Sequence, residues 1–551
     1  VSMLLKRASQ GRGARYAEWI ERAMLNGVLG TQRGEEPGAY LYFMPLGASV
    51  SKSAPQSWRH AGWSTPYGDF WCCMGTGVEA FAQLGQMAFL QKEREGQLPE
   101  LHVLQLIPTS LRWRAAGLRF TLDATYAGVT HPDNPLGFTL TIEATTAPGA
   151  PAAVMLRLPS WATNLTLTLN GASILPKTLN ASTSTSASTS TFASNTPITL
   201  AHASASDPLG ASQPPSFLPS LSNVSYVRTE RVWRTGDEIT MRCQAHLWME
   251  RLADPRPRYS NLHALLFGPL VLACIGCKEL TLQVTPPQLL PWMSPVPRTA
   301  SSQLRSFHRA TARGAAPGTI ILGHDGIVYV REGELASPPF RHRRRGATDL
   351  AVATTFRLLP GLTGADNTVS FEPFLRPGCY IAAPSTPLQG HQQQPVKDGG
   401  DGASLQLRLL CEPSPADVRL CSFKRHDPLV STAHGSFQSY ESLSHPKHFI
   451  STHGAPSPRT AKGPAAKSAG FETIRPLQLV ERPPTPASAN SFTPSPFALE
   501  SSFEEAVAAA EYPAASWWMR SPTGAVTSAL LYPLNEVVDE TYSVYFDLAP
   551  S

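Results

Sequence analysis

Short runs in which apolar and polar residues alternate constrain the fold of this chain more than any other feature. They recur between Leu101 and Leu272, and turn sequences such as Asn170-Gly171 and Thr235-Gly236-Asp237 lie between them. Alternation with a period of two, interrupted by turns, is typical of antiparallel sheets. The 51 prolines and 40 glycines agree with many turns. We predict an antiparallel β-sandwich with strands at 101–107, 118–124, 138–143, 154–158, 165–169, 238–243 and 262–272.

The N-terminal residues, 1–95, show a helical spacing instead. Apolar residues recur at helical intervals in 14–29 and again in 78–92. Between them lies the aromatic stretch 38–47, which fits either a strand or an extended loop that lines a cavity. Two helices joined by long aromatic loops suit an α-helical barrel, in which the loops build the site. We therefore expect 1–95 to be part of such a barrel.

The last third of the chain contains a faint internal repeat. Ser370-Phe371-Glu372-Pro373-Phe374 resembles Ser436-Phe437-Gln438-Ser439-Tyr440, and each is followed by a Pro-containing turn and a second aromatic strand. Such repeats indicate a β-trefoil, whose units bury one shared core. Two Ser/Pro/Ala-rich tracts, 178–220 and 451–502, hold few large apolar residues, so we expect disordered insertions there. The predicted domains are 1–95, 96–345 and 346–551.

Two adjacent cysteines, Cys72 and Cys73, stand immediately before the second predicted helix. Two glycines follow them and permit a tight entry, and Thr76 is expected to cap the first turn. A thiol just ahead of a helix faces unpaired N–H groups and the positive end of the dipole, so its thiolate is favoured. The pair could share a metal ion or divide the work at a site. The alternative is that both are buried structural cysteines.

Aromatic and polar residues cluster around this pair. The cluster consists of His60, Trp63, Tyr67, Asp69 and Trp71. Aromatic faces stack on the C–H faces of sugars, and polar side chains form directional hydrogen bonds with hydroxyls. Taken singly, each residue fits a core position as well as a site. Together with two cysteines, they favour a sugar-binding cleft that includes His60, Trp63 and Trp71.

The other cysteines are interpreted as structural. Cys274-Ile275-Gly276-Cys277 has the spacing of redox and zinc motifs, but it closes an apolar run and has no second pair at zinc-ribbon spacing. We interpret it as packed or incidentally paired cysteines. The remaining four, Cys243, Cys379, Cys411 and Cys421, fall in β-rich sequence.

Charge and hydropathy argue against two classes of partner. A formal charge of +5 is mild for 551 residues, and the basic run 341–345 lacks interleaved aromatics, so we expect an exposed linker and no nucleic-acid partner. No apolar run is long enough to span a bilayer. Sequons at Asn164, Asn180 and Asn223 permit a secretory route. The chain starts at Val1 in helical sequence, so we expect a fragment of a longer protein.

A series of motifs in order along the chain resembles those of a known family. They lie at 16–23, 26–29, 32–34, 45–47, 70–79, 156–161, 233–237, 266–270 and 539–546. The family is glycoside hydrolase family 127, and Cys-Cys-x-Gly-Thr-Gly-x-Glu looks like its plant and green-algal branch of β-L-arabinofuranosidase-like proteins. Residues 348–548 resemble the arabinofuranose-binding β-trefoil of carbohydrate-binding module family 42.

The resemblance implies a retaining hydrolysis that uses zinc and cysteine in an (α/α)6 barrel. Cys72 would be the nucleophile, and both Cys72 and Cys73 would bind zinc. The family's other ligands, a Glu and a Cys in Glu-x-Cys, and its acid/base glutamate would lie before Val1. We therefore expect this chain to hold the last third of the barrel and to be inactive alone. The expected fold is thus the C-terminal part of an (α/α)6 barrel, a β-sandwich and a β-trefoil-like domain.

In the trefoil, the resemblance implies that Asp427 and His453 hold arabinofuranose. The first repeat has Ala382-Ala383 where the family has a histidine, so that pocket is expected to be lost.

The resulting hypothesis is a secreted or wall-associated L-arabinofuranosidase with zinc as its cofactor. Its partners would be arabinofuranose-containing oligosaccharides, hydroxyproline-rich glycoproteins or wall polysaccharides. Two alternatives stay open: a non-catalytic carbohydrate-binding wall protein, and a structural or redox role for the cysteines.

Overall fold

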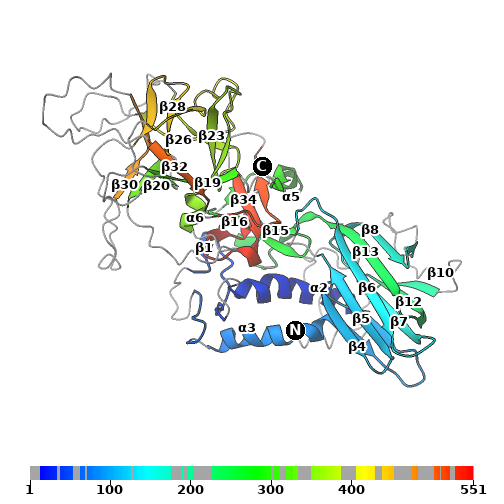
Figure 1. Ribbon diagram of the computed structural model, residues 1–551. Helices are drawn as coiled ribbons and strands as arrows, with labels where there is room; N and C mark the ends of the chain where they lie inside the picture. Colours follow the sequence, from blue (N-terminus) through cyan, green and yellow to red (C-terminus); the bar gives the residue numbers. More distant parts are fainter. Residues whose placement is uncertain are drawn as a thin grey trace, which may run out of the picture. The chain divides into compact units, whose positions relative to one another are not determined.

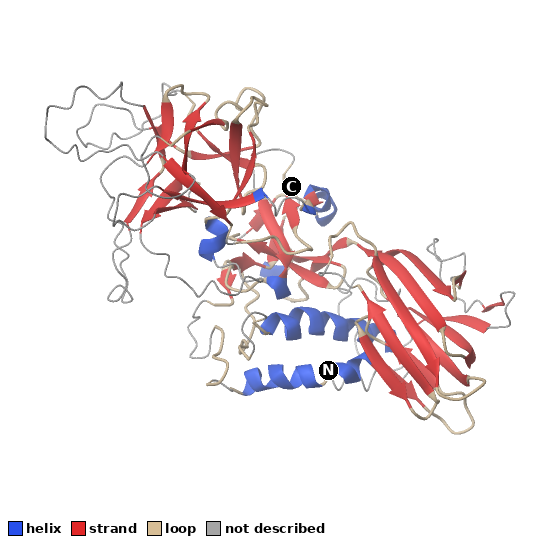
Figure 2. Ribbon diagram, viewed as in Figure 1, coloured by secondary structure: helices blue, strands red, loops and turns tan. Residues whose placement is uncertain are grey.

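The structure, a computed structural model, is rich in β-strands and has several domains (Figures 1 and 2). It divides into two units. Unit 1 comprises Val1–Pro295, Pro513–Trp517 and Leu531–Ser551, and unit 2 comprises Val296–Tyr512 and Trp518–Leu530. The described residues are 13–33, 38–53, 62–68, 71–125, 130–174, 189–191, 197–202, 225–278, 280–298, 303–309, 318–323, 326–332, 349–385, 405–428, 437–451, 473–481, 502–508, 510–521 and 528–549.

Two helical segments begin unit 1 and are blue in Figure 1. Helix α2, Gly13–Arg22, continues through a π-helical turn, Ala23–Val28, and a 3₁₀ turn, Leu29–Thr31. Its buried residues recur at helical spacing: Ala17, Ile20, Met24 and Leu25. Helix α3, Cys72–Ala82, is followed by the short helix α4, Leu84–Ala88. Both predicted helices are therefore present, whereas the (α/α)6 barrel stays a prediction.

The second helical segment ends earlier than predicted. Residues expected to be helical form strand β2, Phe89–Lys92, which pairs antiparallel with β3, Glu100–Val103. The hairpin satisfies the backbone groups of these residues, and this pairing overrides the helical spacing of their side chains.

Two six-stranded sheets follow, with orders β10-β11-β12-β7-β3-β2 and β4-β5-β6-β13-β8-β9. Their further strands are β4 (Thr109–Trp113), β5 (Leu118–Ala124), β6 (Leu136–Ala144), β7 (Ala150–Leu158), β8 (Ala162–Leu169), β9 (Ala172–Ser173), β10 (Thr189–Thr191), β11 (Pro197–His202), β12 (Ser225–Trp233) and β13 (Asp237–Ala245). Buried and exposed residues alternate along β5, and β12 contacts β6 across the two sheets. Strands are therefore present at every predicted position between 101 and 243, but β3 ends at Val103 and not at 107, and it pairs parallel with β7, whereas we predicted an antiparallel sandwich.

A buried ion pair joins α2 to the first of these sheets. Arg157 in β7 is fully buried, and its guanidinium donates to both carboxylate oxygens of Glu21 at 3.2 and 2.6 Å. Its Nε donates to the Leu104 carbonyl at 2.7 Å. Glu21 also accepts the indole N–H of Trp161 at 2.8 Å. A buried charge is tolerated only when it is paired and hydrogen-bonded, so this cluster fixes α2 against the sheet.

A third sheet, most of whose residues belong to unit 1, combines strands from the middle of the chain with strands from its C-terminal end. They include β1 (Val50–Ser51), β14 (Leu247–Arg251), β15 (Leu262–Phe267), β16 (Leu270–Ile275), β17 (Leu280–Leu282), β34 (Ala529–Pro533), β35 (Thr541–Ser543) and β36 (Tyr545–Leu548). β36 pairs with β15 and β17, and β35 pairs with β16 and β1. The predicted strand 262–272 is thus a hairpin of this sheet and does not belong to the sandwich. Alternation along one strand does not specify which sheet the strand joins.

In unit 2, strands close into a ring. β19 (Leu304–Arg309) pairs with β22 (Phe356–Pro360), then follow β23 (Thr368–Pro373), β27 (Phe423–His426), β28 (Phe437–Ser442) and β32 (Ser502–Val507), which pairs with β19 again. Three further pairs are β20 (Gly318–Leu322) with β21 (Val328–Glu332), β24 (Cys379–Ala382) with β26 (Arg408–Cys411), and β29 (His448–Ser451) with β31 (Gln478–Glu481). The order of ring strand, hairpin pair and ring strand therefore repeats along the chain.

Each repeat contributes one aromatic residue of its first ring strand to a shared core: Phe307, Phe371 and Tyr440. The ring centroids lie 5.2 Å apart for Phe307 and Phe371, and 5.1 Å apart for Phe371 and Tyr440. This packing shows that the repeats bury one core, as we predicted.

The register of the predicted repeat was wrong. Val369 pairs with Phe423 in one repeat, and Gln438 pairs with Phe503 in the next, so Phe371 corresponds to Tyr440. The prediction aligned Phe371 with Phe437, three residues earlier. The Ser-Phe match at 436–437 misled it, because burial and not residue identity marks the equivalent position, and Tyr440 is 1% exposed.

The boundaries of the units also differ from the predicted domains. Strands β19, β20 and β21 were assigned to the predicted sandwich domain, but they belong to unit 2, which begins at Val296 and not at 346. The C-terminal segment 531–551 was assigned to the trefoil but belongs to unit 1. Most of the predicted disordered tracts, 178–220 and 451–502, lies outside the described residues. The described parts of these tracts include strands β10, β11, β30 (Thr473–Pro476) and β31.

Candidate functional site

Cys72 and Cys73 are the first two residues of helix α3. Trp71 precedes them in extended conformation, and its carbonyl accepts the N–H of Gly75 at 3.0 Å, which closes the first turn. Thr76, predicted to cap this turn, instead lies inside the helix and donates to the carbonyl of Cys72 at 3.1 Å. The correction places both thiols in the first turn, where unpaired N–H groups and the helix dipole favour negative charge.

The Cys72 thiol has two polar neighbours. Its Sγ lies 3.2 Å from the hydroxyl of Tyr42 and 4.0 Å from the Sγ of Cys73. The hydrogen bond with Tyr42, and then that with Cys73, lowers the pKa of Cys72 below its usual value. The same contacts raise the pKa of Tyr42, so the phenol stays protonated and donates a hydrogen bond to the sulfur. Both thiols are exposed, so the Cys72 thiol, with its lowered pKa, is accessible to solvent.

The position of Tyr42 depends on the extended stretch 38–47. Its neighbour Leu41 forms a backbone bridge with Trp63, and Tyr40 lies against α3. A Cβ atom added at Gly77 of α3 would lie 3.3 Å from the Tyr40 ring. Gly77 therefore permits the close approach of α3 to the stretch that carries Tyr42, rather than the tight helix entry that we predicted.

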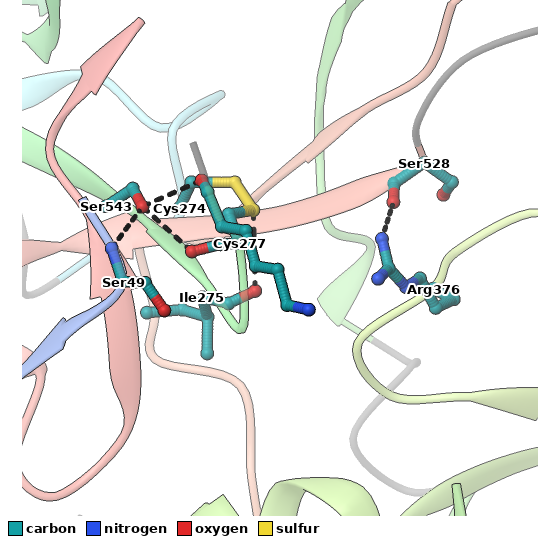
Figure 3. The surroundings of a disulfide bond; sticks show 8 residues. Ser49, Cys274, Ile275, Cys277, Arg376, Ser528 and Ser543 are labelled. Carbon is teal, nitrogen blue, oxygen red and sulfur yellow. Dashed lines mark hydrogen bonds between the residues drawn. A yellow bond between two sulfur atoms is a disulfide. The ribbon is translucent and has the colours of Figure 1, made fainter. Parts of the chain in front are cut away.

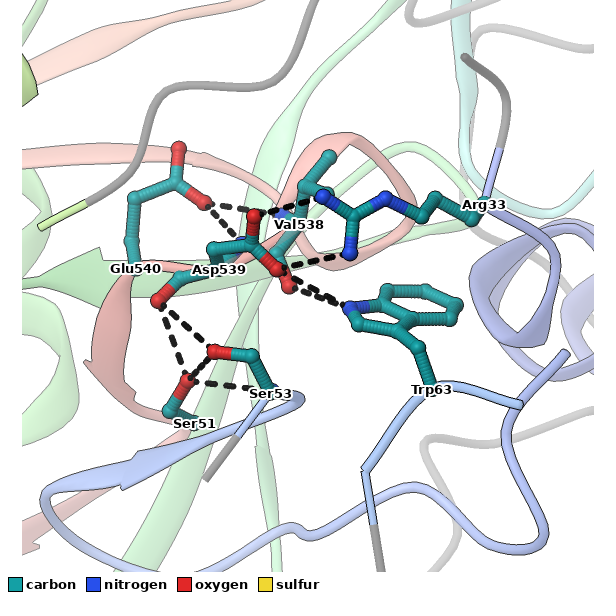
Figure 4. A network of polar contacts seen from close by, with 7 residues as sticks. All are labelled: Arg33, Ser51, Ser53, Trp63, Val538, Asp539 and Glu540. Atoms are coloured by element: carbon teal, nitrogen blue, oxygen red, sulfur yellow. Dashed lines mark hydrogen bonds and ion pairs between the residues drawn. The ribbon is translucent and has the colours of Figure 1, made fainter. Parts of the chain in front are cut away.

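Trp63 is held in a polar network with the C-terminal segment (Figure 4). Arg33 donates to both carboxylate oxygens of Asp539, at 3.1 and 2.8 Å, and the indole N–H of Trp63 donates to the same carboxylate at 3.1 Å. The Arg33 guanidinium lies 5.5 Å from the centre of the Trp63 ring. The hydroxyl of Ser51 donates to the Asp539 carbonyl at 3.0 Å. The Trp63 indole, predicted to contact sugar, thus already has a carboxylate partner.

Two buried charged residues flank this network. The Nζ of Lys52 donates to three carbonyls, those of Gly30, Leu534 and Val537, at 2.8, 2.8 and 2.7 Å. Burial lowers the pKa of Lys52 to about 7, although the nearby carboxylates act in the opposite direction and raise it. Burial raises the pKa of Glu540 to about 7, although its carboxylate accepts the Tyr532 hydroxyl and two backbone N–H groups. Both groups thus change charge near neutral pH.

Sequence reasoning missed the part that Asp539, Glu540 and Lys52 play here. Asp539 is separated from Arg33 by 506 positions, and no local spacing connects them. The only signal was the resemblance of 539–546 to the family's C-terminal motif.

The other predicted site residues are spread over both units. Trp71 is 46% exposed beside the cysteine pair. Asp427 follows β27 of unit 2 and is exposed, whereas Ala382 and Ala383 are buried and present only methyl groups. The predicted sugar ligands His60 and His453 lie outside the described residues.

The donor set of the cysteine pair fits part of a zinc site. Two sulfurs bound at about 2.3 Å to one tetrahedral zinc ion lie about 3.8 Å apart. The observed separation between Cys72 and Cys73 is 4.0 Å. Among the described residues, the structure shows no group of three or more His, Cys, Asp or Glu side chains that could hold a metal ion. The pair would therefore supply at most two sulfur ligands, and a zinc ion would need others.

Four of the cysteines form disulfides. Cys274 and Cys277 are bonded and buried (Figure 3), and Cys379 is bonded to Cys411 across the paired strands β24 and β26. The hydroxyl of Ser543 donates to the Cys277 carbonyl at 2.8 Å. These contacts agree with the structural interpretation of these cysteines.

Cys243 and Cys421 are free and buried, and burial raises the pKa of each thiol to about 12. They stay protonated at neutral pH and are unreactive in comparison with Cys72.

Within the described residues, no helix is both long and apolar enough to cross a bilayer.

Residues 2–86 match the sequence model of a family described as β-L-arabinofuranosidase, GH127 catalytic domain. No curated protein matches the chain. Among solved structures, a glycoside hydrolase has 16% identity and a TM-score of 0.33, with 60% of this chain and 43% of that chain covered. A GH127 β-L-arabinofuranosidase from Geobacillus stearothermophilus T6 has 16% identity and a TM-score of 0.29, with 60% and 41% covered. A GH127 β-arabinofuranosidase has 12% identity and a TM-score of 0.29, with 65% and 42% covered. The chain thus spans about two fifths of the length of these structures.

Proposed function

We propose that this chain is part of a retaining glycoside hydrolase that releases L-arabinofuranosyl residues, with Cys72 as its nucleophile. One observation carries the proposal: an exposed thiol at the start of α3, 3.2 Å from the Tyr42 hydroxyl, lies inside the segment that matches the GH127 catalytic domain. A thiolate with a lowered pKa is the activated nucleophile that covalent catalysis needs.

In the proposed reaction, the Cys72 sulfur attacks the anomeric carbon of the arabinofuranosyl unit. The C–S bond forms as the bond to the leaving oxygen breaks, and a carboxylic acid protonates that oxygen. Water then attacks the anomeric carbon and gives one proton to the carboxylate left by the first step, and the C–S bond breaks to restore the Cys72 thiolate, so two inversions retain the configuration. Tyr42 stabilises the thiolate before attack by donating a hydrogen bond from its hydroxyl to the sulfur.

Cys72 and Cys73 would be two of the ligands of a zinc ion in this site. When bound, zinc would supply positive charge that keeps both thiols deprotonated. The two sulfurs at the helix N-terminus would provide soft donors, and their separation of 4.0 Å is close to that of two ligands of a tetrahedral zinc ion. His60, Trp63 and Trp71 are proposed to contact the sugar.

For unit 2, we propose a β-trefoil that binds arabinofuranose, with Asp427 and His453 as ligands. Support comes from the threefold order of ring strand, hairpin and ring strand and from the shared aromatic core. Asp427→Ala should weaken binding to arabinose-bearing polysaccharide, whereas Asp366→Ala, at another exposed aspartate in the turn before β23, should not.

The substrates would be arabinofuranose-containing oligosaccharides, hydroxyproline-rich glycoproteins or wall polysaccharides. The protein would act on them outside the cell or in the cell wall. The two disulfides support this location, because disulfides persist in oxidising compartments.

The test uses the protein expressed from its complete gene, with β- and α-linked arabinofuranosides, with and without a chelator. We expect turnover of the β-linked substrate that Cys72→Ser abolishes. A pentosyl adduct on the Cys72 peptide should be trapped by rapid acid quench and mass spectrometry. Cys243→Ala, at a buried thiol with a raised pKa, is the matched control and should keep its activity.

Undiminished turnover in Cys72→Ser would refute the nucleophile. Sugar binding without turnover in the complete protein would favour the alternative, a non-catalytic carbohydrate-binding wall protein. The inactivity of the 551-residue chain alone stays a prediction of the resemblance, and measured turnover by it would contradict that prediction.

A further inference from the structure

The sequon at Asn164 lies on a bulge of strand β8. Thr163 pairs with Gln244 and Thr166 pairs with Arg242, so Asn164 and Leu165 oppose a single residue of β13. Asn164 has a φ of +50°, in the left-handed region that asparagine tolerates better than most residues. The side chains of Asn164 and Thr166 are both exposed. The acceptor amide and the hydroxyl of the sequon are therefore both accessible in the folded chain.

The contacts of the Asn164 amide leave room for a covalent substituent. Its Nδ2 donates one hydrogen bond, to the Oε1 of Gln244 at 2.6 Å. A primary amide carries two N–H bonds, and only one of them is needed for this contact. Replacing the other by a bond to carbon would preserve the hydrogen bond to Gln244, so the fold need not change.

The same part of β8 lies at an edge of its sheet. β13 pairs with β8 on one side, whereas β9 pairs on the other side only with Thr168 and Leu169. In the described parts of the chain, no strand pairs with residues 162–166 on the side of β9. An open edge is a template for the addition of a strand from another molecule, and proteins usually protect it. A bulky polar group on Asn164 would block this edge.

We propose that Asn164 is an N-glycosylation site and that its glycan shields the free edge of β8. The donor is a polyprenyl-diphosphate-linked oligosaccharide of the secretory pathway. The amide nitrogen attacks C1 of the first sugar, the N–C1 bond forms, and the C1–O bond to the diphosphate breaks. The amide gives up one proton, and the polyprenyl diphosphate leaves with the electron pair.

The experiment translates the full 551-residue chain behind a cleavable leader into microsomes and isolates the protease-protected product. Glycans are removed with a peptide N-glycosidase in heavy-oxygen water, which converts each glycosylated asparagine to labelled aspartate. We expect label at Asn164 in the original chain and in Thr166→Ser, and loss of the label in Thr166→Ala. Asn170 is the internal control: it is also left-handed but has alanine two residues later, so it should stay unlabelled.

An unlabelled Asn164 in protected chain would overturn the proposal, whether or not Asn180 or Asn223 carries label. The shielding role has its own readout. At equal concentration, Thr166→Ala should form several-fold more sedimenting aggregate than Thr166→Ser. Adding Leu165→Lys to Thr166→Ala places a charge at the free edge of β8, so aggregation of this double variant should return to the level of Thr166→Ser. Equal aggregation of the two Thr166 variants would refute the shielding role.

Discussion

Replacing Arg157 with methionine should destabilise unit 1 far more than the loss of an ordinary ion pair. Arg157 is fully buried and gives two hydrogen bonds to Glu21 and one to the Leu104 carbonyl. Methionine fills part of the same volume but leaves the Glu21 carboxylate buried without a positive partner. Removing one partner of a buried pair costs about 3–5 kcal/mol. The indole N–H of Trp161 still donates to Glu21, so we expect a loss of about 4 kcal/mol.

A double variant separates the charge from the packing. In Arg157→Met/Glu21→Gln the Glu21 charge is removed and the glutamine can still accept the Trp161 N–H, while Glu18, whose carboxylate lies 3.8 Å from Arg157, keeps its hydrogen bonds from the N–H and hydroxyl of Ser160. Neutral replacement of a buried pair often costs little, so the double variant should recover about half of the loss. Arg119→Met is the matched control, because Arg119 pairs with Glu143 at 3.0 Å while their side chains are 46% and 49% exposed. Its cost should be about 0.5 kcal/mol or less.

Differential scanning calorimetry is the assay, with the transition of unit 2 as an internal reference. At about 2 °C per kcal/mol for a large domain, the transition of unit 1 should fall by about 8 °C in Arg157→Met. The double variant should lose about 4 °C, and Arg119→Met about 1 °C. Equal shifts in Arg157→Met and Arg119→Met would refute the reasoning, and so would a double variant less stable than Arg157→Met.

Three further predictions follow from the site. Tyr42→Phe removes the hydroxyl that lowers the pKa of Cys72, so alkylation of Cys72 in the metal-free chain at pH 7 should become slower. The control variant Tyr67→Phe should not change the alkylation rate. Equal rates in Tyr42→Phe and the original chain would contradict the role of the hydroxyl. Because the pKa of Glu540 is raised to about 7 in the folded state from 4.5, stability should fall as the pH rises from 4.5 to 7, by up to about 3 kcal/mol. Glu540→Gln should remove that slope in pH-dependent denaturation, and an unchanged slope would assign it to another group. Asp539→Ala removes the ion pair and the indole hydrogen bond of Figure 4, and it should increase acrylamide quenching of tryptophan fluorescence; unchanged quenching would argue against that network.

Local patterns predicted the elements well where one face of a strand or helix is buried. The alternation in 118–124 and 238–243 corresponds to β5 and β13, and the helical spacing of 14–29 corresponds to α2 and its extensions. These local patterns could not predict which strands pair with one another. Strands β19 and β32 close the ring of unit 2 from positions nearly 200 residues apart, and alternation in each strand would look the same in any sheet.

The candidate site was predicted in part for the same reason. The Cys-Cys pair could be recognised because it is contiguous and precedes helical spacing. Its contact with Tyr42 spans 30 positions, and the Asp539 network spans 506, so neither has a sequence period. The predicted start of the second helix was too late, because the two glycines and Thr76 were interpreted as its first turn. In the structure, α3 begins at Cys72, and the extended Trp71 is its N-cap.

The discontinuity of unit 1 has a consequence for synthesis on the ribosome. β15 ends at Phe267, but its partner β36 begins at Tyr545. At about 5–20 residues per second, the nascent chain waits about 15–55 s between these strands. During that time the edges of β15 and β17 lack their native partner, while unit 2 emerges and can complete its own ring. A chain terminated shortly before Tyr545 would therefore carry a folded unit 2 beside an unfinished sheet, which is the kind of exposed edge that chaperones and proteases recognise.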